Sequence, residues 1–245
     1  MAGHSQFKNI MHRKGAQDAK RAKLFAKLAR EITVAAKSGM PDPKQNPRLR
    51  SAITNARHEN MPNDRINKAL QNGASNEEGS NYEEIRYEGI GSGGVFFIIE
   101  TLTDNRNRTA SEIRTIFNKN GGVLGEPGSA GFNFEKIGVV KYDSQNISKE
   151  KFFDFSIDKN ALDVIEEGPY IISTCNPENF SKFRDDLELE FGEPKKSELI
   201  WKAKNPIKLE LDIEKKVLSL IDLLEENDDI QRVFSNINLN QDLEK

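Results

Sequence analysis

Basic side chains recur along one segment of the sequence at a spacing that suits a row of phosphate groups. The segment is predicted to be a helix, in which successive residues turn by about 100° and rise by about 1.5 Å. The basic residues then form one stripe roughly 25 Å long, opposite the apolar face. They are Lys20, Lys23, Lys27, Arg30 and Lys37. Phosphates bound along this stripe would release condensed counterions, so binding would weaken steeply as salt is added.

The alternative explanation is that the stripe is an ordinary solvated helix face. Such faces mix both signs of charge, whereas the eight basic residues from Lys8 to Arg30 are opposed by Asp18 alone. Arg13 and Lys14 extend the basic patch ahead of the helix. We therefore predict nucleic-acid contact by Lys8, Arg13, Lys14 and the five residues of the stripe. Reversing three of the stripe lysines to glutamate is expected to abolish binding without changing the far-UV circular dichroism.

The charge of the chain is segregated along its length. The net charge of the 245 residues is −3, yet residues 1–75 hold 15 Lys and Arg against 5 Asp and Glu, a net +10. Residues 76–245 hold 21 against 34, a net −13. Such asymmetry predicts that the first part meets a polyanion and that the acidic remainder has another role.

Several classes of protein are not indicated by the composition. The sequence has no apolar run near the roughly 20 residues that a membrane span needs, and no secretory signal is recognisable, so we expect a cytoplasmic protein. Cys175 is the only cysteine and is expected to be a buried thiol. His4 and His12 have no cysteine or carboxylate partners at ligand spacing, so no metal site is expected.

A glycine-rich motif at Gly89–Gly94 matches the G-x-G-x-x-G pattern of dinucleotide-binding folds. That pattern requires the glycines to open a helix, whereas here they lead into the apolar run Val95–Ile99, which is typical of a strand. We interpret the glycines as a hairpin turn. No nucleophile-and-base arrangement is recognisable elsewhere, so we expect neither a cofactor nor an enzyme.

A polar loop from Thr103 to Thr109 is a second candidate site. Its donors Arg106, Arg108 and Thr109 precede a predicted helix and are suited to an anion such as phosphate. The alternative is helix capping with a solvated turn. A capping-box pattern, Thr109-Ala-Ser-Glu112, predicts that the helix opens at Thr109.

The remaining periodicity predicts an α+β protein of more than one domain. Helices are expected between Gly15 and Gly39, after Asn46-Pro47, and after Pro62 as far as Gly73. After these three helices the apolar period changes to that of strands. Strands are expected near residues 82–88, 95–99, 132–134, 139–142, 170–175, 198–202, 207–211 and 230–234, and helices near residues 109–120, 149–165, 178–191 and 213–224.

The sequence resembles the YebC family along essentially its whole length. The motifs that carry the resemblance are Met1-Ala-Gly-His-Ser5, His12-Arg-Lys14, Gln17-Asp-Ala-Lys-Arg21, Arg30-Glu-Ile-Thr-Val-Ala-Ala36, Asn46-Pro-Arg-Leu-Arg50, Thr103-Asp-Asn-Arg-Asn-Arg-Thr109 and Lys119-Asn-Gly-Gly122. The resemblance implies three domains: a basic three-helix bundle (1–75), a discontinuous middle α/β domain (76–135 plus 205–245) and a third α/β domain (136–204). The two α/β domains are expected to be small ferredoxin-like sandwiches.

The resemblance also implies a non-enzymatic role in gene expression, with two mechanisms left open. One is a transcriptional regulator that binds DNA through the basic helical domain. The other is a ribosome-associated translation factor that binds ribosomal RNA through the same domain. A lysine-rich stripe contacts phosphates without reading bases, which favours RNA or non-specific DNA. The acidic domains would then contact the ribosome or another protein. We expect a monomer with no membrane partner.

Overall fold

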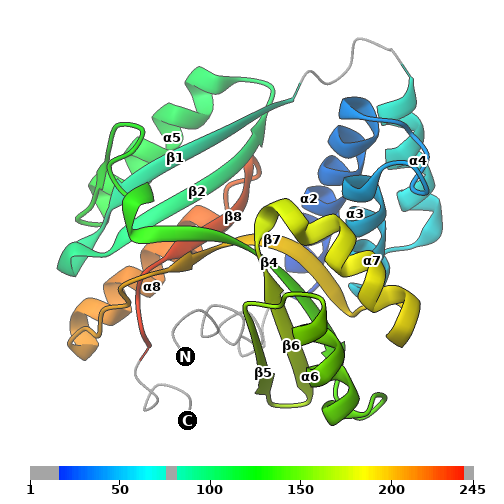
Figure 1. The fold of residues 1–245 in the computed structure, drawn as a ribbon. Helices are drawn as coiled ribbons and strands as arrows, with labels where there is room; N and C mark the ends of the chain where they lie inside the picture. The colour runs from blue at the N-terminus through cyan, green and yellow to red at the C-terminus, as the bar shows by residue number, and fades with distance from the viewer. Residues whose placement is uncertain (1–16, 76–81, 240–245) are drawn as a thin grey trace. The chain divides into compact units, whose positions relative to one another are not determined.

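The computed structural model describes residues 17–75 and 82–239, and the chain divides into two compact units (Figure 1). Among the described residues, one unit comprises residues 17–27, 82–135 and 201–239, and the other comprises residues 28–75 and 136–200. The chain is a mixed α/β protein with three N-terminal helices followed by two small sheet domains, as predicted. The exact domain boundaries given above stay a prediction.

The three N-terminal helices are α2 (Gln17–Ser38), α3 (Pro47–His58) and α4 (Asn63–Ala74). The side chain of Asn46 caps α3 by accepting a hydrogen bond from the Leu49 amide at 3.0 Å, which confirms the predicted start. Gly73 does not end α4 as predicted but lies inside it. A Cβ there would be 2.4 Å from the Thr33 carbonyl oxygen, so the glycine serves the close approach of α2 and α4.

The first sheet is built from segments far apart in the sequence. Its strands are β1 (Glu83–Ile90), β2 (Phe96–Thr103), β3 (Val123–Leu124) and β8 (Ile230–Ser235), in the order β3-β1-β2-β8. The helices α5 (Arg106–Lys119) and α8 (Leu211–Glu225) share one core with this sheet, which includes Phe97, Ile113 and Leu220. The last strand of the chain therefore completes a sheet that begins at residue 83.

The second sheet contains β4 (Phe134–Asp143), β5 (Asp163–Glu167), β6 (Tyr170–Cys175) and β7 (Lys196–Ala203), in the order β5-β6-β4-β7. Helices α6 (Lys149–Asp158) and α7 (Phe180–Phe191) complete a β-α-β-β-α-β succession. This succession and strand order are those of a ferredoxin-like sandwich. Its core includes Val140, Phe152, Ile171 and Leu187. Cys175 is buried as predicted, and burial raises the pKa of its thiol to about 12.

Several predicted elements differ in the structure. The helix expected at 149–165 ends at Asp158, because the chain turns through Asn160 with φ +63° and then forms β5, a strand that was not predicted. The segments 132–134 and 139–142 belong mainly to the single strand β4, with Phe132 in a short 3-10 turn. The strand expected at 207–211 is absent: Ile207 forms one isolated bridge, and α8 begins at Leu211. The very short β3 was not predicted either.

None of the helices in residues 17–75 and 82–239 is both long and apolar enough to cross a membrane.

Candidate nucleic-acid interface

All five residues of the predicted stripe lie on α2. Lys20, Lys23 and Lys37 are exposed, whereas Lys27 and Arg30 are partly buried. Lys8, Arg13 and Lys14, the other predicted contacts, lie outside the described residues. The opposite side of the helix is apolar and buried, as the periodicity requires, and includes Phe25, Ile32 and Ala35. Leu24, an apolar residue of the same helix, is 38% exposed.

Two of the stripe lysines contact the end of a second helix in the same unit. Lys23 Nζ donates to the carbonyl oxygen of Glu226 at 2.9 Å, and Lys27 Nζ donates to that of Glu225 at 2.7 Å. These carbonyls belong to the last turn and cap of α8, where backbone groups lack helical partners and carry partial negative charge. Burial raises the pKa of the Glu225 carboxyl, and the nearby charge of Lys27 opposes that shift. A phosphate bound by Lys23 would therefore replace a neutral carbonyl, and one bound by Lys27 would also come near the Glu225 carboxyl.

The polar side of α3 is engaged by residues of the same unit that come much later in the chain. Arg50 Nη2 contacts both oxygens of Asp185 at 2.8 Å, and Thr54 Oγ1 donates to Glu193 at 3.0 Å. Asn55 exchanges hydrogen bonds of 3.2 Å with the backbone of Ser197. These three side chains of α3 are therefore not free to reach base edges.

Arg184 is the largest fully buried side chain in this unit and fixes α3 further. It is 1% exposed, and its Nη1 donates to the carbonyl of Pro47 at 2.8 Å and to Ser51 Oγ at 2.6 Å. Its guanidinium also contacts the carboxylate of Asp185. A buried guanidinium needs such partners, so α3 is held in place by hydrogen bonds at both its first turn and its middle.

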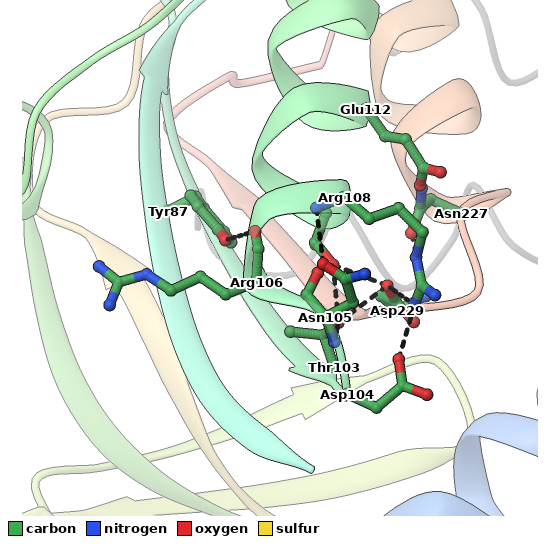
Figure 2. Close-up of polar contacts among 10 residues, drawn as sticks. Tyr87, Thr103, Asp104, Asn105, Arg106, Arg108, Glu112, Asn227 and Asp229 are labelled. Carbon is green, nitrogen blue, oxygen red and sulfur yellow. Dashed lines mark hydrogen bonds and ion pairs between the residues drawn. The ribbon is translucent and has the colours of Figure 1, made fainter. Parts of the chain in front are cut away.

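The predicted anion-binding loop contacts a carboxylate of the chain itself (Figure 2). Asp229 Oδ2 accepts hydrogen bonds from Arg108 Nη2 at 2.8 Å, Thr109 Oγ1 at 2.7 Å and Thr103 Oγ1 at 3.0 Å. Burial raises the pKa of Asp229, but these hydrogen bonds outweigh it, so the pKa lies below its ordinary value. Asp229 thus takes the place that the sequence assigned to an external anion, and any such anion would compete with it.

The start of α5 also differs from its prediction. The helix begins at Arg106 rather than at Thr109, because the Asn105 side chain caps it by accepting from the Arg108 amide at 3.1 Å. Thr109 therefore lies in the first turn, where its hydroxyl reaches Asp229. In Figure 2 the side chain of Arg106 points away from Asp229, so the structure brings Arg108 and Thr109 together but not Arg106.

A second buried carboxylate was missed by sequence reasoning. Glu88 of β1 is 1% exposed and accepts hydrogen bonds of 2.7 Å from the amides of Ala130 and Gly131. Its burial raises the pKa, but the backbone donors and the charge of Arg86 lower it below the ordinary value. The alternation of β1 gives no signal for this, because the amides come from a loop some forty residues later.

Within residues 17–75 and 82–239 no group of three or more His, Cys, Asp or Glu is placed to hold a metal ion.

Comparison with known proteins matches nearly the whole chain. A family model described as the TACO1/YebC protein N-terminal domain matches residues 5–76, and one described as the TACO1/YebC second and third domain matches residues 82–237. The crystal structure of a conserved hypothetical protein from Aquifex aeolicus is also similar, with a TM-score of 0.84 and 38% identity. That match covers 95% of this chain and 96% of the Aquifex chain.

Proposed function

The chain belongs to the TACO1/YebC family, whose members are transcriptional-regulator-like proteins or translational activators, and from this premise we propose that it is a non-enzymatic regulator of gene expression that binds nucleic acid through α2. One observation carries the proposal. Five basic residues, three of them exposed, follow one side of a 22-residue helix whose opposite side is apolar and buried. A row of cations in this arrangement suits a phosphate backbone.

The proposed contact is with the backbone rather than with bases. Lysine ammonium groups bind phosphates as point charges and read no sequence, whereas base recognition needs side chains free to reach base edges. Three polar side chains of α3, the neighbouring helix, are held by Asp185, Glu193 and Ser197. We therefore infer binding that tolerates many sequences.

The first candidate target is duplex DNA, bound in the manner of a transcriptional regulator. The second is ribosomal RNA, which would make the protein a translation factor. The engagement of α3 supports this second candidate, because an RNA surface is recognised largely through the shape of its phosphate backbone and does not need a free recognition helix.

A paired experiment distinguishes the two targets. Lysate would be sedimented on a gradient at low and high salt, with and without nuclease, and the full chain would be tested for retardation of duplex DNA. Retardation of duplex without ribosome association supports the DNA candidate. Ribosome association that nuclease abolishes, with no duplex retardation, supports ribosomal RNA. If neither occurs, the proposed function is wrong.

A further inference from the structure

The outer side of α6 exposes two large apolar side chains. Phe153 and Ile157 are 50% and 47% exposed, while Phe152 and Ser156 on the same helix are fully buried. Residues four apart on a helix are neighbours, so Phe153 and Ile157 form one continuous apolar ridge. The helix already contributes its inner side to the core of the second sheet, so this ridge is an additional apolar surface.

The same side of α6 carries three exposed carboxylates. Glu150, Asp154 and Asp158 follow one another every four residues, which places them in a row beside the apolar ridge. Within the part of the chain that the structure describes, none of the three has an ion-pair partner.

The lysines of α6 are turned to the flanks of the helix. Lys149 pairs with Glu166 of β5, and Lys151 pairs with Glu190 of α7. Lys159, just past the end of α6, contacts Asp186 at 3.6 Å. Both lysines of α6 are thus paired with carboxylates of other elements, and the large groups left without an ion-pair partner on the outer side of the described helix are apolar or acidic.

We propose that this outer side of α6 is a docking surface for a basic amphipathic helix of a partner protein. Such a helix would place its apolar residues at positions i and i+4 on Phe153 and Ile157, and its lysines or arginines along the row of carboxylates. The surface excludes other partners by charge. Nucleic acid and an anionic membrane surface would be repelled by the carboxylates, and a second copy docked through its own α6 would bring two acidic rows together.

The proposal is independent of nucleic-acid binding by α2, so the two can fail separately. The probe is a fluorescent synthetic peptide of about 18 residues, made of leucine and lysine with an i, i+4 apolar period, since helices much shorter than 12–15 residues are marginal. A scrambled peptide of the same composition has the same charge but no apolar stripe. Binding of each to the full chain is measured by fluorescence anisotropy at several salt concentrations.

The decisive variants change only exposed side chains. We expect the double change Phe153→Ser and Ile157→Ser to weaken binding of the amphipathic peptide by at least about tenfold, with the salt dependence unchanged. Neutralising the row with Glu150→Gln, Asp154→Asn and Asp158→Asn should weaken binding and also reduce its salt dependence. Leu189→Ser, which changes an 89% exposed side chain on α7, is the matched control and should bind like the wild type. Unfolding temperature, measured for each protein, confirms that the fold is kept.

Three results would overturn the proposal. The first is equal binding of the amphipathic and scrambled peptides, which would show a general attraction to an acidic protein. The second is equal binding by the wild type and the Phe153→Ser, Ile157→Ser variant. The third is self-association in sedimentation velocity that the same variant abolishes, which would make a second copy the occupant.

Discussion

The salt dependence of nucleic-acid binding gives a count of the α2 residues that contact phosphates. Each duplex phosphate contact adds about −0.9 to the slope of log K against log salt, so raising salt from about 50 to 200 mM lowers affinity about 3.5-fold per contact. If all five stripe residues bind phosphates, they account for a loss of about 500-fold, whereas three contacts account for about 40-fold. The difference between the two losses is the contribution of Lys23 and Lys27, whose ammonium groups contact the C-terminal carbonyls of α8 in the structure.

We expect Lys23 and Lys27 to exchange their carbonyl partners for phosphates, since a hydrogen bond between two charged groups is the stronger one. The double change Lys23→Gln and Lys27→Gln should then reduce the slope by about 1.8, and Lys20→Gln alone by about 0.9. Glutamine is the appropriate replacement. Glutamate would place new carboxylates against the C-terminal carbonyls of α8 and would disturb the fold, contrary to the expectation from the sequence alone.

The assay is fluorescence anisotropy of a labelled duplex with the full chain, titrated at four or more salt concentrations. Lys68→Gln, which removes one exposed lysine from α4 of the same helical module, is the matched control and should leave the slope unchanged. Thermal unfolding of each variant separates lost binding from lost structure. If Lys20→Gln has no more effect than Lys68→Gln, the stripe is an ordinary solvated face and the reasoning is refuted.

Three further predictions concern stability. Asp229→Ala should lower the free energy of unfolding by about 1–3 kcal/mol in urea, because the buried Thr103 hydroxyl and the Arg108 guanidinium lose an acceptor, while Asp104→Ala, an exposed change, should have little effect. The pKa of Glu88 is lower in the folded state than its ordinary 4.5. Its ionised carboxylate therefore stabilises the fold above pH 4.5, and this stabilisation is lost as pH falls through the folded pKa. Glu88→Gln should lose less free energy of unfolding across that pH range than the wild type does. Gly73→Ala should destabilise by about 1–3 kcal/mol in thermal or urea unfolding, against the usual gain from alanine in a helix, because its Cβ would meet the Thr33 carbonyl. No loss on that change would mean that α2 and α4 can separate.

Sequence periodicity predicted the elements that repeat an apolar pattern over several turns or strand residues. The three N-terminal helices and the hairpin of β1 and β2 are of this kind, and Asn46 was recognisable as a cap because its partner is three residues away. The failures share a different cause. The strand expected at 207–211 rested on three alternating residues, too few to distinguish a strand from the approach to α8, and β3 has only two residues.

The candidate site was predictable only where its partners are local. The basic stripe follows from the spacing of α2 alone. In contrast, the acceptors of Lys23 and Lys27 lie about 200 residues later in the chain, and Asp229 lies 120 residues from Thr109. Asp229 is one of many carboxylates in an acidic segment, and nothing in the local sequence distinguishes it as the residue that contacts the Thr103–Thr109 loop. Such long-range pairs form because β8 pairs with β2 in the first sheet, and the local sequence does not specify this strand pairing.

The partners of the basic groups also explain why nucleic-acid binding is expected at α2 and not in the acidic part of the same unit. In that part Arg108 contacts Asp229, Arg86 contacts Glu88 at 3.1 Å, and Arg232 contacts Glu100 at 2.6 Å. A phosphate approaching any of these arginines would have to displace a carboxylate and leave it unpaired, which is costly where the carboxylate is buried. At Lys23 it would displace the neutral carbonyl of Glu226, which water can then solvate, whereas Lys27 also lies near the Glu225 carboxyl. The exchange therefore favours phosphate on α2, and the same difference predicts that neutralising Arg86 or Arg232 leaves the salt slope of nucleic-acid binding unchanged.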